Sequence, residues 1–256
     1  MVDINPYQAP QADVADPSSG EEALANDPKS VDAGRGVAWI TEGWTLFRQA
    51  PAIWIAITVI AAAGFIILSI VPILGQIASP LLSVLVAGGI MLGCRGLNRG
   101  EPLTVAHLVA GFRDHLNPLL VIGALYLGGM FAVIVVASVV TGGAAFALVR
   151  GSPDAGIAIT SMLLIMLVVM LLMIPLIMAI WFAPALVTLH NVEPVRALQL
   201  SFRGCLRNLL PFLVYGIVTF VLAIIASIPF GLGWLVLLPV LAGSVYTSYH
   251  DIFLLD

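Results

Sequence analysis

The chain has 256 residues, of which 61% are hydrophobic and only 9% are charged, and its mean hydropathy is +1.09. A soluble domain carries about 25% charged and about 45–50% apolar residues, so this composition excludes a water-soluble globular protein. It also excludes a collagen-like chain, a coiled coil and a disulfide-stapled scaffold. We therefore expect an all-α polytopic membrane protein.

Charge is distributed unevenly along the chain. Residues 1–36 hold seven of the fourteen acidic residues but only two basic ones, Lys29 and Arg35, and the other eight basic residues are all arginines. This pattern indicates membrane orientation rather than nucleic-acid binding, so we expect no nucleic-acid partner. The two cysteines, Cys94 and Cys205, each lie near an arginine, which places them near the cytosol, where a disulfide is not expected.

The first 33 residues differ from the rest of the chain. They contain four prolines, many acidic residues and almost no large apolar residue, a composition typical of disorder. We expect residues 1–33 to be a disordered acidic cytosolic tail. The motif at 5–10, Asn-Pro-Tyr-Gln-Ala-Pro, is a candidate docking peptide for protein partners, although a purely solubilising tail is the simpler interpretation.

Residues 34–256 are expected to form a six-helix transmembrane domain, because a span needs about 20 apolar residues. The expected spans are 52–74, 77–97, 117–141, 158–190, 209–230 and 233–253. We expect the pair Gly142-Gly143 to break the third stretch, and Pro175 and Pro184 to kink the fourth.

The arginines predict the orientation of these spans. Nine of the ten basic residues fall on one side of the membrane, and only Arg150 falls on the other. That side is therefore expected to be cytoplasmic. We expect a multi-pass protein of the bacterial inner membrane with both termini in the cytoplasm.

An internal repeat is also predicted. A Phe-Arg pair followed by proline precedes each odd-numbered span, and the pairs are Phe47-Arg48, Phe112-Arg113 and Phe202-Arg203. We expect three parallel repeats, each an amphipathic interfacial helix followed by a hairpin of two spans. The arginines of these segments would face anionic lipid headgroups, or they would only fix the orientation. The candidate headgroup residues are Arg48, Arg113 and Arg203, supported by Arg95, Arg99, Arg196 and Arg207.

Residues that could carry chemistry are few. No span has an acidic or basic residue in its middle, which disfavours proton-coupled or voltage-driven transport. A His190/His250 pair could ligate haem or a metal, but the simpler interpretation is that both are histidines at the membrane surface without a ligand role. The methionines of the fourth stretch could bind copper(I), but packing is the simpler reading; they are Met162, Met166, Met170 and Met173. Ser201 has no acidic partner nearby, so we expect no enzyme and no catalytic, cofactor-binding or metal site.

Three segments carry a resemblance to known proteins. They are the entry 34–47, with Gly-Arg-Gly-Val-Ala-Trp and Trp-Thr-Leu-Phe, the helix from Glu193-Pro194 to Ser201-Phe202-Arg203, and the end 244–253. Over about residues 34–253 the chain resembles an uncharacterised family of bacterial polytopic inner-membrane proteins. More distantly, it is similar to the membrane domain accompanying glycerophosphodiester phosphodiesterases, although the catalytic domain of those enzymes is absent.

These observations favour a non-enzymatic inner-membrane protein, a scaffold or accessory subunit that contacts anionic lipid or partner proteins. One alternative is a transporter or channel for a small or amphipathic solute, to which a kinked fourth span and parallel repeats are suited. A second alternative is a membrane protein that bears a cofactor or metal.

Overall fold

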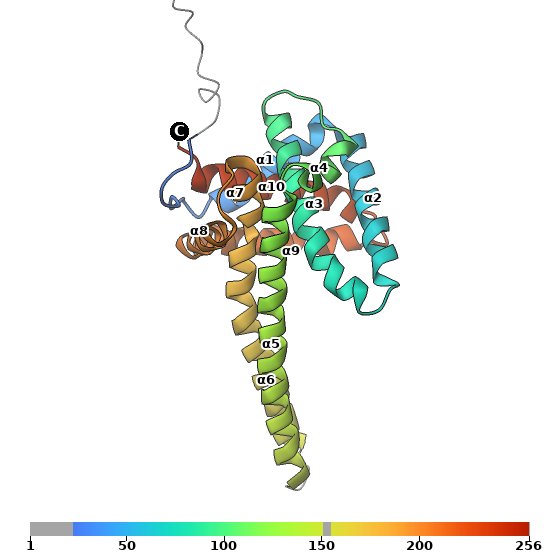
Figure 1. Ribbon diagram of the computed structural model, residues 1–256, viewed down its shortest axis with the longest axis vertical. Coiled ribbons are helices and arrows are strands. Elements are labelled where there is room, and N and C mark those ends of the chain that lie inside the picture. Colours follow the sequence, from blue (N-terminus) through green and yellow to red (C-terminus); the bar gives the residue numbers. More distant parts are fainter. Residues whose placement is uncertain (1–22, 151–154, 256) are drawn as a thin grey trace, which may run out of the picture.

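The computed structural model describes residues 23–150 and 155–255, and within these ranges the chain is helical apart from loops and one isolated β-bridge (Figure 1). The elements are α1 (Arg35–Gln49), α2 (Pro51–Ser69), α3 (Leu74–Asn98), the 3₁₀ helix η2 (Val105–Val109), α4 (Ala110–Arg113), α5 (Leu116–Arg150), α6 (Ala155–Trp181), α7 (Ala183–His190), α8 (Pro194–Arg207), α9 (Leu209–Ser227) and α10 (Trp234–Phe253).

Five segments are long and apolar enough to cross a membrane, which confirms an all-helical membrane protein. They are Pro51–Ser69, Leu74–Asn98, Leu116–Val139, Met162–His190 and Leu209–Ser227. The sixth expected span, 233–253, forms α10, but its C-terminal half contains polar residues such as Thr247 and Asp251 that lower its hydropathy. Six crossings and the threefold repeat therefore stay predictions.

Two local expectations were wrong. Helix α5 runs without a break through Gly142-Gly143, since a glycine inside a helix costs only about 1 kcal/mol relative to alanine. The second amphipathic segment is not one helix but η2 followed by the one-turn α4. It packs so closely on α3 that a Cβ at Gly111 would lie 2.2 Å from the Leu85 carbonyl oxygen.

The fourth apolar stretch is interrupted where Pro184 predicted a kink. Helix α6 ends at Trp181 and α7 begins at Ala183, while Pro175 lies inside α6. The Ser201 hydroxyl of α8 enters the break: it accepts the Phe182 N–H at 2.9 Å and donates to the Met178 carbonyl at 2.7 Å. It thus replaces the helical bond that Phe182 and Met178 would otherwise share.

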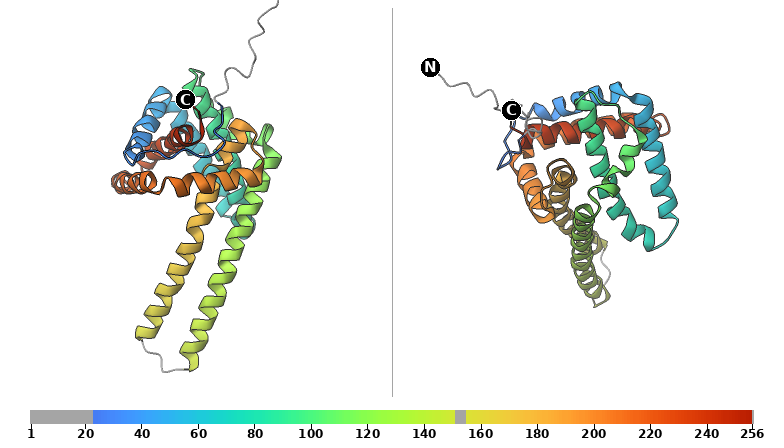
Figure 2. Two further views of the ribbon diagram at one scale, coloured as in Figure 1. Left: turned by 90° about the vertical axis from the view of Figure 1, so that its left-hand side faces the viewer. Right: turned by 45° about the horizontal axis from the view of Figure 1, so that its top comes forward.

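Helices α5 and α6 form a long hairpin that projects away from the other helices (Figures 1 and 2). Apolar side chains along this hairpin are exposed; Phe131, Leu163 and Leu171 are each more than half exposed. Such a surface is stable only against lipid or another apolar surface.

The core lies instead where α1 and α10 run side by side, blue and red in the right-hand view of Figure 2. The two helices touch through glycines. A Cβ at Gly43 would lie 2.4 Å from the Val240 carbonyl oxygen, and one at Gly243 would lie 3.0 Å from the Gly43 Cα. Small residues at such crossings let helix backbones approach closely.

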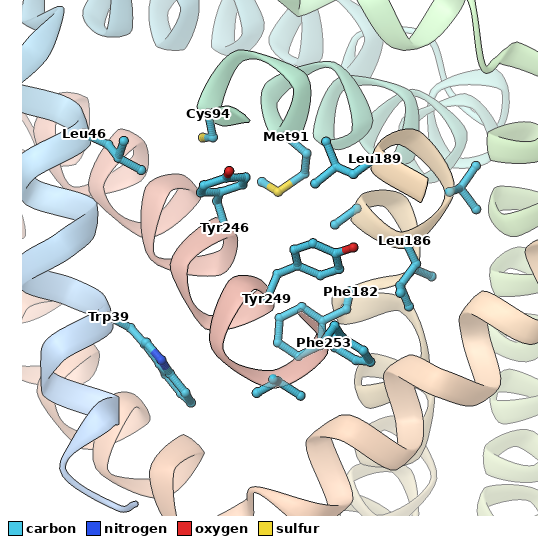
Figure 3. Packing of buried hydrophobic residues seen from close by; sticks show 14 of the residues in the cluster. Trp39, Leu46, Met91, Cys94, Phe182, Leu186, Leu189, Tyr246, Tyr249 and Phe253 are labelled. Atoms are coloured by element: carbon cyan, nitrogen blue, oxygen red, sulfur yellow. The ribbon is translucent and has the colours of Figure 1, made fainter. Parts of the chain in front are cut away.

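From this crossing α10 reaches the neighbouring helices with aromatic side chains. Tyr246 lies beside Met91 and Cys94 of α3, and Tyr249 points toward α7 (Figure 3). Tyr249 stacks on Phe253 with ring centroids 5.4 Å apart, and Phe253 meets Phe182 edge to face at 5.2 Å. Although α10 was expected to be a membrane span, half of its residues are buried within the protein.

Residues 23–33 form an ordered strap, although we expected this part of the tail to be disordered. Leu24 pairs with Leu254 in an antiparallel bridge, and the Lys29 N–H donates to the Ile252 carbonyl at 2.7 Å. The buried Asn208 side chain donates to the Lys29 carbonyl and accepts the Val31 N–H, both at 2.9 Å. The expected docking motif at 5–10 lies outside the described residues.

The glycine contact between α1 and α10 predicts a large cost for a side chain there. Gly43→Leu should lower the free energy of unfolding by about 3 kcal/mol, because backbone atoms of α10 cannot move aside as side chains do. Gly216→Leu is the matched control, since a Cβ at that position in α9 points into open space and has no neighbour within 4 Å beyond the adjacent backbone of its own helix. Thermal unfolding in detergent measures both, and equal midpoints for the two variants would contradict the tight crossing.

The strap predicts a cross-link between the two ends of the chain. Directly opposed residues in an antiparallel pair have Cα atoms about 4.5–5.5 Å apart, within the range of a disulfide. Leu24→Cys combined with Leu254→Cys should therefore form an intramolecular disulfide on mild oxidation of membranes, detected by peptide mass spectrometry. Each single variant is a control, and the native cysteines are buried. Labelling of the two cysteines from opposite sides of the membrane would refute the strap.

Candidate functional site around the C-terminal half of α10

A cluster of charged side chains joins α1 to α10. The Arg35 Nε donates to Asp251 Oδ2 at 2.5 Å, and the Trp39 indole N–H donates to the same oxygen at 2.7 Å. The Nη2 atom of Arg35 lies 2.9 Å from Oε1 of Glu42, a residue two helical turns farther along α1. Thr247 adds a bond from its hydroxyl to the Trp39 carbonyl at 3.2 Å.

Partial burial strengthens these interactions. The Asp251 side chain is 20% exposed and that of Arg35 is 34% exposed, so water screens the pair less than it would on an open surface. The hydrogen bond to Asp251 is the main cause of a raised pKa for the Arg35 guanidinium, which therefore stays charged. Two carboxylates share one guanidinium, so the cluster carries a formal excess of one negative charge.

A cavity of about 380 Å³ opens beside this cluster, between α1, α10 and the C-terminal end of α3. Its polar lining combines charged groups, hydroxyls and amides. The lining residues are Arg35, Glu42, Thr45, Leu46, Gln49, Asn98, Tyr246, Thr247, His250 and Asp251.

A second and much smaller cavity adjoins the first at Tyr246, which lines both. Two arginines of α3, Arg95 and Arg99, line it together with His190 and Tyr249. The Tyr249 hydroxyl and His190 Nδ1 share a hydrogen bond of 2.6 Å, and an Arg95 Nη1 donates to the Leu189 carbonyl at 3.1 Å. Among the residues that line this second cavity, the charged ones are the two arginines.

The predicted headgroup arginines do not form one patch. Arg95 and Arg99 share the small cavity, and Arg203 and Arg207 line another cavity beside the strap. An Arg207 Nη1 donates to the Pro28 carbonyl at 2.6 Å, so this arginine also holds the strap. The remaining three candidates are exposed on separate elements; they are Arg48 at the end of α1, Arg113 of α4 and Arg196 of α8.

The structure also places the other residues that were weighed for chemistry. Ser201 is fully buried and bridges the break between α6 and α7. Burial raises the pKa of Cys205 to about 12, so it stays an unreactive thiol. Met162, Met166 and Met170 are each more than half exposed on the projecting hairpin. Within residues 23–150 and 155–255 no group of three or more His, Cys, Asp or Glu side chains is placed to hold a metal.

Sequence reasoning missed the cluster of Arg35, Glu42 and Asp251. Two signals could have found it. Glu42 and Asp251 are acidic residues in a strongly apolar chain, and Arg35 and Glu42 are seven residues apart, on one face of a helix. The segments 34–47 and 244–253, which carried the family resemblance, are those that meet in this cluster.

Together, the apolar helices, the central packing of α10 and the polar junction at its C-terminal half define a polytopic α-helical membrane protein. A protein of Burkholderia thailandensis named a probable inner membrane protein is 32% identical over 230 residues, which cover 84% of this chain and 82% of that protein. The chain therefore belongs to the same family of bacterial inner-membrane proteins. No protein-family model and no solved structure matches it. Nothing in these comparisons supports the resemblance to the membrane domain of glycerophosphodiester phosphodiesterases.

The cluster predicts a specific loss of stability. Asp251→Asn should lower the free energy of unfolding by about 2 kcal/mol, because a half-buried guanidinium loses its charged acceptor. Chemical unfolding followed by tryptophan fluorescence measures the change. Asp114→Asn, at an exposed position after α4, should leave stability within about 0.5 kcal/mol of the wild type. Equal stability of the two variants would show that the cluster contributes nothing.

Proposed function

We propose that the protein is a non-enzymatic scaffold or accessory subunit of the inner membrane that binds anionic phospholipid headgroups at its cytoplasmic face. The observation that carries this proposal is the division of α8 into three faces. One face packs on the protein, one is apolar and partly exposed, and one bears arginines.

The packed face of α8 contains Ala197, Leu200, Ser201, Gly204 and Cys205, all of which are buried. The apolar face follows a spacing of three and four residues, and its ends are exposed, Val195 at 45% and Leu206 at 51%. The residues of this face are Val195, Leu198, Phe202 and Leu206.

The arginine face lies about a third of a turn from the apolar face, at 100° per residue. It carries Arg196, Arg203 and Arg207. A helix with exposed apolar and cationic faces side by side is suited to the boundary between acyl chains and phosphate groups. Arg203 and Arg207 line a cavity of about 400 Å³ with Asp27 of the strap, whose Oδ1 lies 4.0 Å from an Nη1 of Arg203. The two arginines and this carboxylate leave one formal positive charge that would attract an anion there.

The strap supports the proposal that both ends of the described chain lie on the same side of the membrane. Because Leu24 pairs with Leu254, the two ends of the described chain lie together, and the number of crossings between them is even. Five candidate spans include α9 but not α10. An even number requires α9 and α10 either both to cross, which gives the six expected spans, or both to stay on one side.

The alternative of a transporter or channel has less support. The interior where the helices meet is filled by large side chains, and Trp39, Trp54, Phe182, Tyr249 and Phe253 are almost completely buried. The two polar cavities around α10 lie at one end of that helix rather than along the protein. The alternative of a bound cofactor or metal gains no ligand set from the described residues.

Removing two of the proposed headgroup arginines should release lipid. Arg113→Gln combined with Arg203→Gln should weaken binding of anionic lipid by about 2 kcal/mol, since each basic residue near a membrane surface contributes about 1 kcal/mol. Lipid extraction and mass spectrometry of protein purified in mild detergent should then show severalfold less phosphatidylglycerol and cardiolipin per chain.

Arg150→Gln is the matched control, because Arg150 ends α5, a 35-residue helix that begins close to Arg113. It removes one guanidinium at the far end of that helix and should leave the lipid content unchanged. Reporter fusions check that the orientation of each variant is intact. An unchanged content of anionic lipid in the double variant, with intact orientation, would rule out the proposed function.

A further inference from the structure

Two apolar grooves open on the surface of the protein, and both are built in the same way. In each groove, two long helices joined by a turn form a hairpin, and an amphipathic segment from another part of the chain lies against it. Groove A lies between α9, α10 and α1 and has a volume of about 480 Å³. Groove B lies between α2, α3 and the segment η2–α4 and has a volume of about 380 Å³.

The amphipathic segments line the two grooves with the same spacing of residues. These residues are Ile40, Thr41 and Trp44 in groove A, and Leu108, Val109 and Phe112 in groove B. The residue before each aromatic side chain is a glycine, Gly43 or Gly111, which lets the segment approach a backbone carbonyl of the second helix of the hairpin. One kind of contact therefore forms a groove on two different hairpins.

The walls of both grooves offer almost no partner for water. Every residue that lines groove B is apolar. In groove A the polar side-chain groups are the Trp44 indole N–H and the Thr41 hydroxyl, which already donates to the Ala38 carbonyl at 2.8 Å. A water molecule in a cavity needs about two to four polar partners. The grooves are therefore suited to an apolar ligand.

An exposed arginine lies close to the aromatic residue of each groove. Arg48 follows Trp44 by one helical turn, and Arg113 follows Phe112 directly. Each arginine also precedes a candidate membrane span, α2 or α5, by three residues, which places both near the level of the lipid headgroups. The salt bridges among the described residues involve neither arginine. A phosphate can therefore bind beside each groove.

We propose that each groove holds one acyl chain of a phospholipid whose phosphate is bound by the neighbouring arginine, Arg48 at groove A and Arg113 at groove B. This inference rests on the proposed function, and it adds where the lipid lies and which part of it the protein recognises. Lipid tails are as apolar as leucine, so the groove selects the acyl chain by close packing. A lipid held in this way is retained when lipids around the other helices are exchanged for detergent.

The repetition of the groove favours a lipid over a protein partner. The two grooves lie on different hairpins, and the membrane supplies as many lipid molecules as there are sites. A second copy of the chain would need a matching surface for each groove. The volumes also lie at the lower end of the range for small-molecule sites, which suits one alkyl chain better than a helix about 10–12 Å in diameter.

Filling groove B with a side chain tests the proposal. Gly64→Leu places a leucine in this groove, and a Cβ at Gly64 has no neighbour within 4 Å beyond the adjacent backbone of its own helix. Gly216→Leu is the matched control, because its Cβ also points into open space but lines neither groove. The delipidated full chain in maltoside detergent is incubated with dioleoyl phosphatidylglycerol, and native mass spectrometry counts the lipids that stay bound. Gly64→Leu should retain one lipid fewer than the wild type, and Gly216→Leu should retain the same number.

The same assay tests groove A. Thr41→Trp fills this groove from an exposed position whose hydroxyl bonds only within α1. Val37→Trp is the control, one turn earlier on α1, where the side chain is 44% exposed and lines neither groove. Thr41→Trp should also lose one lipid, and its combination with Gly64→Leu should lose two. Equal lipid counts in the filled variants and their controls would overturn the proposal.

The result can be separated from that of the proposed function. Unchanged lipid counts in Gly64→Leu and Thr41→Trp, with the expected loss of anionic lipid when Arg113→Gln and Arg203→Gln are combined, would overturn the grooves alone. Unchanged anionic lipid in that arginine variant would contradict the proposed function, and with it the phosphate contact proposed at groove B. A Gly64→Leu variant that turns a dimer into a monomer without losing lipid would assign groove B to a second copy and also overturn the proposal.

Discussion

The contact between α1 and α10 is the constraint on which the other packing depends. Glycines at 43 and 243 let the two backbones meet, and this approach brings Arg35 and Trp39 to Asp251. A carboxylate that is largely withdrawn from water needs charged or hydrogen-bonding partners, and here both come from α1. Once α10 is fixed in this way, its tyrosines extend to α3 and α7. The polar C-terminal half of α10 therefore contacts helices from the beginning, the middle and the later part of the chain.

The apolar helices could be read from hydropathy because each is a local property of about 20 consecutive residues. The break before α7 was also local, since proline lacks an N–H. The burial of α10 was not a local property, because it depends on Gly43 of another helix, two hundred residues away from Gly243. Gly142-Gly143 shows the opposite error: a local signal for a break was outweighed by the apolar helix on either side.

The candidate site also combines features that are local in the sequence with features that appear only in the folded chain. Arginine counting located basic residues near one end of the spans, but it did not show that Arg95 and Arg207 bind backbone carbonyls. Asp251 and Arg35 are separated by 216 residues, so only the folded chain reveals them as a pair. Residues 23–33 were expected to be disordered because that prediction used only their composition. The strap is held by hydrogen bonds to backbone groups and to the Asn208 side chain, and composition contains no information about such distant partners.

The strap has a consequence for the biosynthesis of the protein. Its partners include Ile252, Phe253 and Leu254, which are translated more than two hundred residues after it. While the helices enter the membrane one after another, residues 23–33 have no docking site, because these partners are still within the ribosome or not yet made. Closure of the strap is thus among the last folding events, and it marks a chain whose C-terminal helix has been completely synthesised and has reached its place between the others.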